Sequence, residues 1–378
     1  MLDRLVVAEI DLSAYAHNIS ILRSHLSAAT KLMAVLKANA YGHGLVPIAL
    51  HAEKIGVDYL GVVSLGEART LRKAGLKLPI LILNYIDPEG AIEAVKLHVD
   101  ITVMDDEVLG ALGKHLNKTH GRAKIHIKVD TGMHRAGVMP SDVLKFAQRV
   151  NKTKGITLQG LFMHFSTADD ADLSFAKKQL DVFQSVIQEL HENGIRPPVI
   201  HAANSAATLT LPQSHFSMVR PGIATYGLSP FGKDHPGYAK FTKQFVPILS
   251  LKTQIVQIRT IKVSESVGYG RTFIAKRKTR IALLPVGYGD GFRRAPQNAK
   301  EVLVRGKYAP ILGRVSMDQT SIDITDIPTA KLHDEVVLIG TQGKNAISAE
   351  QVGDTTGTIN YEVVTALSER VARTYKNL

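Results

Sequence analysis

The chain has 378 residues, 45% of them hydrophobic, a size and composition that fit two globular domains. No run reaches the roughly 18 apolar residues of a membrane span, and Met1–Val7 has an acid and a base where a signal peptide needs an apolar stretch. The lack of cysteine excludes disulfides, thiolate nucleophiles and cysteine-ligated metals. These features predict a soluble, cytoplasmic protein.

The formal net charge of +12 comes from bases that are spread along the chain. Only small clusters occur, such as Lys276-Arg277-Lys278 and Arg293-Arg294, and there is no tryptophan and no basic tail. No nucleic-acid-binding module is recognisable. The charge therefore predicts a solvated basic surface rather than a nucleic-acid partner.

Short apolar runs, each followed by a helix-like segment, recur through the first part of the chain. One helix-like segment spaces apolar residues by three and four from Leu173 to Leu190, and another begins with the capping-box pattern Ser64 to Glu67. Eight such alternations predict a (β/α)₈ barrel of the TIM type, with a site at the C-terminal ends of its strands. The eight runs are Leu32–Leu36, Tyr59–Val63, Ile80–Leu83, Ile101–Met104, Lys124–Val129, Leu158–Met163, Val199–Ala203 and Met218–Ile223.

After about residue 240 the pattern changes to short β-rich segments with Gly-containing turns and little helix. We expect a boundary in the Gly- and Pro-containing stretch Ser229–Gly237, which gives a barrel domain over 1–235 and a mainly-β domain over 236–378. The β-rich segments include Thr253–Val263, Arg280–Val286, Glu301–Val304, Ala309–Leu312 and Glu335–Ile339.

Polar residues stand at the C-terminal ends of several of the apolar runs. Lys37 closes the first, and a lysine buried at a strand end has a lowered pKa, so that its neutral amine can attack an aldehyde. That is the requirement for a Schiff-base lysine with pyridoxal phosphate (PLP), although a surface lysine at a strand end is the alternative. Ser205 can supply a hydroxyl and begin a helix that faces a phosphate, or it is an ordinary N-cap. Arg220 brings a cation to the same site, unless it only forms a salt bridge at the rim.

The stretch Lys37-Ala38-Asn39-Ala40-Tyr41-Gly42-His43-Gly44 resembles the PLP-lysine motif of alanine racemases. The resemblance continues in order through both predicted domains, as far as Tyr361. Each matching stretch taken alone reads as a Gly-rich turn, but the ordered set resembles the family over essentially the whole chain. The other matching segments are Lys128–Arg135, His201–Ala207, Ser217–Ile223, Gly268–Phe273, Pro285–Gly291, Gly313–Asp318 and Thr358–Glu362.

The resemblance implies an alanine racemase that interconverts L-alanine and D-alanine by a PLP-dependent two-base mechanism and supplies D-alanine for peptidoglycan. Lys37 would carry PLP and take the proton of D-alanine, and Tyr269 would take that of L-alanine. Arg135 and Met317 would contact the substrate, with no metal ion involved. The enzyme would be a homodimer in which Tyr269 and Met317 complete the site of the other subunit. The implied cofactor-binding residues are Lys37, Tyr41, His164, Asn204, Ser205, Arg220, Gly222, Ile223 and Tyr361.

Several alternatives stay open at this point. Lys128 either forms a salt bridge with Asp130 or, as in some family members, is carbamylated and orients Arg135. The substrate is alanine, serine or a broader set of amino acids. A non-catalytic PLP-binding barrel would lack the second domain and the Gly268–Phe273 segment, and a decarboxylase of related fold usually needs a cysteine that this chain lacks.

Overall fold

In the computed structural model, which describes residues 5–295 and 297–377, eight parallel strands close into a barrel. The first four residues of the segment considered above for a signal peptide lie outside the described part. Each predicted run forms one strand, and the last strand pairs with the first, so the predicted barrel is confirmed. The strands are β2 (Lys31–Val35), β3 (Tyr59–Val62), β4 (Ile80–Ile82), β5 (Asp100–Val103), β6 (Ala123–Lys128), β7 (Ile156–Phe162), β8 (Val199–His201) and β9 (Met218–Val219).

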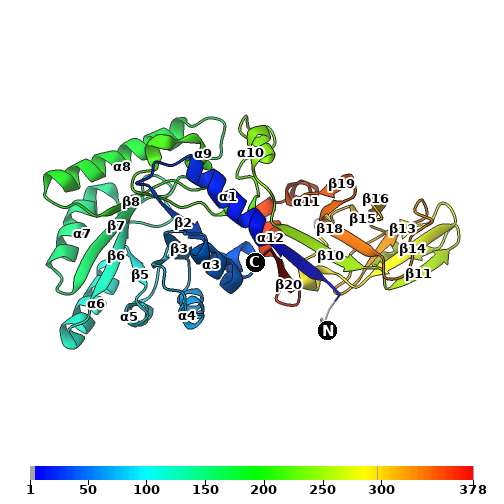
Figure 1. Ribbon diagram of the computed structural model, residues 1–378, viewed down its shortest axis with the longest axis horizontal. Helices are drawn as coiled ribbons and strands as arrows, with labels where there is room; N and C mark the ends of the chain where they lie inside the picture. The colour runs from blue at the N-terminus through cyan, green and yellow to red at the C-terminus, as the bar shows by residue number, and fades with distance from the viewer. Residues whose placement is uncertain (1–4, 296, 378) are drawn as a thin grey trace.

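Helices surround the barrel (Figure 1). The apolar spacing from Leu173 to Leu190 corresponds to α8 (Ser174–Glu192), which buries Ala176, Leu180 and Phe183 against the core. The capping box at Ser64 and Glu67 is present at the start of α4 (Leu65–Lys73). Among the residues with described positions, no helix is both long enough and apolar enough to cross a membrane. The remaining helices of this part are α1 (Leu12–Ser24), α2 (Lys37–Tyr41), α3 (Leu45–Lys54), α5 (Pro88–Lys96), α6 (Asp106–Thr119), α7 (Pro140–Lys152) and α9 (Ser205–Thr210).

The rest of the chain forms a strand-rich second lobe beside the barrel, which we call the β lobe (Figure 1). Its largest sheet has the strand order β16-β15-β18-β10-β1-β20, in which β1 is Val7–Asp11, and β19 pairs with β18. Two smaller sheets contain β11-β14-β17 and β12-β13. The strands are β10 (Leu249–Gln254), β11 (Gln257–Ile261), β12 (Ser266–Val267), β13 (Phe273–Ile274), β14 (Thr279–Leu284), β15 (Glu301–Val304), β16 (Lys307–Pro310), β17 (Thr320–Asp323), β18 (Glu335–Gln342), β19 (Asn345–Ile347) and β20 (Ala372–Lys376).

The predicted β-rich segment Thr253–Val263 contains parts of two strands. The segment is divided between β10 and β11, which belong to different sheets. The chain crosses between the sheets at Ile255 and Val256, whose amides donate to the carbonyls of Asp334 and Leu283. Backbone pairing to two separate partners, which a single apolar run does not encode, decides this break.

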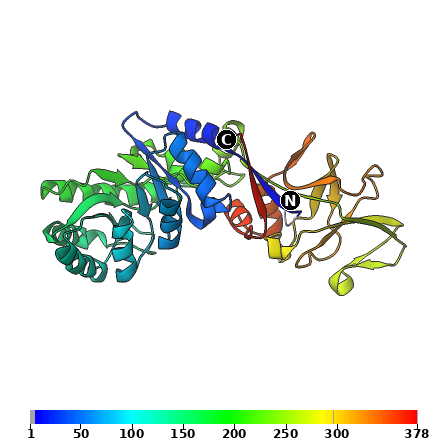
Figure 2. The ribbon, with the colours of Figure 1, turned by 60° about the horizontal axis from the view of Figure 1, so that its bottom comes forward.

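The chain's first strand, β1 (Val7–Asp11), lies in the sheet of the β lobe, between β10 and β20 (Figure 2). From β1 the chain therefore leaves the β lobe's sheet, forms the barrel and returns to that sheet. The boundary between residues 235 and 236 stays a prediction.

The β lobe also contacts the segment that follows Lys37. Arg373 Nε donates to the carbonyl of Gly42 at 2.8 Å, and Tyr375 OH donates to that of His43 at 3.1 Å. A side chain at Gly42 would place its Cβ 2.0 Å from the carbonyl oxygen of Val364 in α12 (Asn360–Thr365). The β lobe thus packs directly on the turn next to Lys37. The other helices of this part are α10 (Tyr238–Gln244) and α11 (Ala349–Thr356).

Candidate active site

A cavity of about 550 Å³ opens at the C-terminal ends of the barrel strands. Its volume is in the range of small-molecule and cofactor sites. Eleven of the residues singled out from the sequence line it, ten from the barrel domain and Tyr361 from α12 of the β lobe. They are Lys37, Tyr41, Lys128, Arg135, His164, Asn204, Ser205, Arg220, Gly222, Ile223 and Tyr361.

Lys37 follows the buried strand β2 and precedes an unusual backbone turn. Ala38, Asn39, Ala40 and Tyr41 have φ angles of 53°, 55°, 54° and 52°, which places four consecutive non-glycine residues in the left-handed region. For L-amino acids this conformation costs roughly 1–2 kcal/mol per residue, and non-glycine residues usually adopt it singly. Such strain persists only where surrounding contacts impose it, and it is typical of functional sites.

The Lys37 side chain is open to the cavity, yet the cavity walls surround its amine. This burial lowers the pKa of Lys37, the Arg135 guanidinium lowers it further, and the Glu67 carboxylate acts in the opposite direction. A lowered pKa increases the fraction of neutral amine at neutral pH. The environment therefore fits a nucleophilic lysine at the cavity wall.

Hydroxyl and amide groups gather at one part of the cavity. Ser205 Oγ accepts hydrogen bonds from the amides of Gly222 (2.9 Å) and Ala224 (3.3 Å), which leaves its own hydrogen for a ligand. A Cβ at Gly222 would come within 2.5 Å of Tyr41 OH, so only glycine lets the backbone approach there. Burial raises the pKa of Tyr41, which keeps its hydroxyl protonated. The N-cap of α9 is Asn204, whose Oδ1 accepts from the Ala207 amide, so Ser205 is not the cap residue.

Arg220 is buried and fully oriented by hydrogen bonds. Its Nη2 donates to the carbonyls of Met163 (2.8 Å) and Ala202 (3.0 Å), and its Nη1 lies 3.1 Å from His201 Nδ1. Burial lowers the pKa of Arg220 to about 9, so the side chain remains a cation at neutral pH. Among the residues that the structure describes, no carboxylate forms an ion pair with Arg220, which argues against the simple rim salt bridge.

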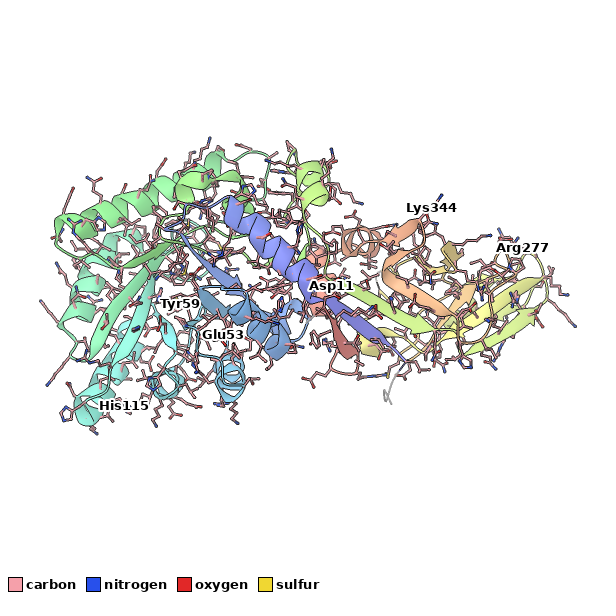
Figure 3. All side chains as sticks on the ribbon, viewed as in Figure 1. Asp11, Glu53, Tyr59, His115, Arg277 and Lys344 are labelled. Atoms are coloured by element: carbon pink, nitrogen blue, oxygen red, sulfur yellow. The ribbon has the colours of Figure 1, made fainter. Side chains whose placement is uncertain are left out.

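Behind Arg220, a chain of hydrogen bonds runs into the barrel interior. His201 Nε2 lies 2.9 Å from His126 Nδ1. His126 Nε2 points towards Asp100 Oδ2 at 3.5 Å, longer than an ordinary hydrogen bond, and Asp100 Oδ2 accepts from Tyr59 OH at 2.7 Å. All of these side chains are buried, with Tyr59 inside the barrel (Figure 3). Because arginine can only donate, His201 Nδ1 must accept, and so each imidazole carries its proton on Nε2.

The sequence analysis missed His126, Asp100 and Tyr59 and gave His201 no role. The sequence did contain a clue. His126 and His201 stand in two barrel strands, at positions where a TIM-type barrel normally has apolar residues. The neighbouring strand makes room for one of them, since a Cβ at Gly160 would lie 2.1 Å from His126 Nδ1.

Lys128 lies on the same wall of the cavity and is buried. Burial, Arg135 and Arg220 lower the pKa of Lys128 to about 8, and Asp130 acts in the opposite direction. The Asp130 carboxylate accepts from the amides of Gly132 and His134, both at 3.0 Å. Within the described residues it forms no ion pair with Lys128, so the salt-bridge alternative is not observed.

Tyr269 and Met317 lie elsewhere. Both belong to the β lobe and are exposed, at 66% and 52%. Tyr269 begins the short turn before β13, which Figure 1 places at the end of the β lobe away from the barrel. The cavity wall, as formed by the described residues of one chain, includes neither side chain.

Two family models match the chain. The model described as "Alanine racemase, N-terminal domain" matches residues 10–230, and "Alanine racemase, C-terminal domain" matches residues 248–375. The chain belongs to the alanine racemase family. Members of this family are PLP-dependent isomerases that interconvert L-alanine and D-alanine, and this is the activity of the present family member. The match of the second domain excludes the single-domain PLP-binding barrel considered above.

Individual relatives agree with this assignment. The chain is 41% identical over 370 residues to an alanine racemase of Halothermothrix orenii, covering 98% of this chain and 96% of the relative. An alanine racemase of Methanococcus maripaludis is 39% identical, with 99% and 100% covered.

Solved structures of alanine racemases have the same fold. That of Clostridium difficile 630 superposes with a TM-score of 0.94 at 34% identity, covering 99% of this chain and 96% of that one. That of Bacillus anthracis with bound L-Ala-P gives a TM-score of 0.93 at 36% identity, with 99% and 95% covered.

The packing of Gly160 gives a test of the hydrogen-bond chain behind Arg220. Gly160→Ala should displace His126, because the new Cβ would overlap its ring. We expect a stability loss of about 1–3 kcal/mol in urea denaturation and a weaker affinity for PLP by titration, because a displaced His126 no longer orients His201 and Arg220. In the control Gly113→Ala in α6, the new Cβ meets Thr153 Cγ2 at 2.9 Å, and neither residue lines the cavity. Equal losses of PLP affinity in both variants would contradict a role for the chain.

Proposed function

We propose that Lys37 carries PLP and that Lys37 and Tyr269 are the two bases of alanine racemisation in this enzyme. The observation that supports this best is the Lys37 amine itself, with its lowered pKa, in a cavity lined by hydroxyls, amides and cations. When bound, PLP withdraws electrons from the substrate and makes its α-proton acidic.

The residues present fit this cofactor. Ser205, Tyr41 and Tyr361 offer hydroxyl donors, and the glycine at 222 leaves room beside them, as an anchor for a phosphate requires. Arg220 is proposed to face the pyridine nitrogen, where it donates a hydrogen bond but keeps its proton. His164, Asn204 and Ile223 complete the proposed wall around the cofactor.

The substrate is proposed to bind through its carboxylate to Arg135, with Met317 as a further contact. Racemisation needs a proton to leave one face of the substrate and another to arrive on the opposite face, so two bases on opposite sides suffice. Lys37 is proposed to take the proton from D-alanine and Tyr269 to take it from L-alanine. Each then returns a proton in the reverse direction.

Because Tyr269 is exposed and its lobe does not bring it to the cavity of its own chain, we propose a homodimer with shared sites. Tyr269 and Met317 of one subunit would complete the cavity around Lys37 of the other. A two-fold dimer places such contacts twice, once for each site.

A complementation experiment tests the shared site. The variants Lys37→Ala and Tyr269→Phe should each lose on the order of 10²–10⁴-fold in racemase activity as homodimers. When both are co-expressed with different tags and the mixed dimer is purified, one of its two sites has both bases, so about half of wild-type activity should return. Mixed dimers no more active than the two homodimers would contradict sharing of Tyr269.

Attachment of PLP and the choice of substrate can be checked together. Borohydride reduction of the holoenzyme followed by peptide mapping should place the pyridoxyl group on Lys37, and label on another lysine would overturn the assignment. The same preparation, incubated with each L-amino acid and analysed by chiral chromatography, should convert alanine fastest. Faster conversion of serine would favour the serine or broad-specificity alternative.

We further propose that Lys128 is carbamylated. With a pKa of about 8, its amine is partly neutral near pH 7, and a neutral amine adds carbon dioxide and releases a proton. The resulting anion would lie beside the Arg135 guanidinium. ¹³C-labelled carbon dioxide should give a carbamate NMR signal that grows from about pH 7 to about pH 9 at fixed dissolved CO₂. A signal of equal size in Lys128→Met would assign it elsewhere.

We also propose that the enzyme acts in the cytoplasm and supplies D-alanine for peptidoglycan. A chain without cysteine needs no oxidising compartment to fold. Growth of a D-alanine auxotroph that expresses this chain without an added leader would support the role, and failure of active enzyme to restore growth would count against it.

A further inference from the structure

One carboxylate connects the Lys37 turn to the neighbouring strand of the barrel. Glu67 Oε1 accepts from the Ala38 amide at 2.8 Å, and Glu67 Oε2 accepts from the amides of Val63 (2.9 Å) and Ser64 (3.3 Å). The capping box accounts for the contact with Ser64, but a helix cap does not require the bond to Ala38. Glu67 therefore joins two segments that are consecutive barrel units.

Ala38 is the first of the four left-handed residues that follow Lys37. Within the turn, Gly42 and Gly44 amides donate back to the carbonyls of Ala38 and Asn39, and the β lobe binds the carbonyls of Gly42 and His43. In the described part of the chain, Glu67 is the one side chain that accepts a hydrogen bond from an amide of residues 38–41. Glu67 therefore binds the backbone at the residue directly after Lys37.

We propose that Glu67 is a positioning residue for Lys37: by binding the Ala38 amide it keeps Ala38 left-handed and so sets the direction of the lysine side chain. The inference rests on the proposed role of Lys37 as the residue that carries PLP. Burial lowers the pKa of Lys37, and the Glu67 charge raises it, which agrees with the proximity of the two groups.

The three amides allow a substitution that separates the two tasks of Glu67. In Glu67→Gln, one oxygen becomes an NH₂ group, which cannot accept a hydrogen bond. Oriented to keep its oxygen on Val63 and Ser64, the glutamine must turn its NH₂ towards the Ala38 N–H. This orientation keeps two bonds and loses one, so the variant should retain the cap of α4 and lose the bond to the Lys37 turn.

Ser64→Ala is the matched control. It removes the Ser64 Oγ that accepts from the Glu67 amide at 3.2 Å, and so weakens the same capping box, but it leaves the Glu67 carboxylate in place for Ala38. Ser64 does not line the cavity. General damage to α4 should therefore affect both variants, whereas loss of the Ala38 contact should affect only Glu67→Gln.

The first measurement is amide hydrogen exchange of the full-length protein without PLP. Glu67→Gln should raise exchange in a peptide covering residues 38–44 by about 10-fold or more, and Ser64→Ala should leave this peptide unchanged. The second is the rate at which added PLP becomes trapped on Lys37 by borohydride, which should fall about 10–100-fold in Glu67→Gln alone because the amine is misdirected. In the holoenzyme, kcat should fall with KM little changed.

A second substitution checks the backbone argument. Glycine adopts the left-handed region without strain, so Ala38→Gly should restore much of the PLP attachment rate in the Glu67→Gln background. This double variant should also fold if Glu67→Gln alone does not. An attachment rate in the double variant no better than in Glu67→Gln, or wild-type exchange and attachment in Glu67→Gln, would overturn the inference. PLP trapped on a different lysine in the wild type would instead contradict the proposed function.

Discussion

The left-handed turn Ala38–Tyr41 is the constraint on which the candidate active site depends. It is unfavourable for L-residues, so contacts from both lobes must impose it. The barrel supplies Glu67, and the β lobe supplies Arg373 and Tyr375, while Gly42 has no side chain because α12 already occupies that space. The β lobe therefore shapes the site of its own chain even though Tyr269 lies far from that cavity. Strand β1 strengthens this coupling, because it pairs with β10 and β20 before the chain enters the barrel.

The second general feature is the positive charge of the cavity. Lys37, Lys128, Arg135 and Arg220 all line it, and together with burial they lower the pKa of His164 well below its usual value. Cations brought together in a partly buried space repel one another, which is unfavourable in the free protein. A phosphate and a substrate carboxylate would neutralise much of this charge. The cluster thus favours anionic ligands.

Much of the fold followed from periodicity. The eight apolar runs are all strands, since a parallel barrel buries both faces of each strand and leaves a short continuous apolar signal. The β lobe was less predictable. Its strand β20 was missed because Ala372–Lys376 contains two charged residues and only partly buried side chains. The division of the β-rich segment Thr253–Val263 between β10 and β11 could not be predicted, because sheet membership is set by distant partners.

The sequence by itself determined the family and the order of the motifs, because those are carried by residue types that follow one another along the chain, and it was enough to propose Lys37 as the cofactor lysine. Only the tertiary structure decided what surrounds them. Burial and charge at Lys37 and Lys128, the histidine chain behind Arg220, the bond from Glu67 to Ala38, and the separation of Tyr269 from its own cavity all depend on contacts between residues far apart in sequence. Such contacts form only after the strands have closed into a barrel, and local sequence patterns do not predict them.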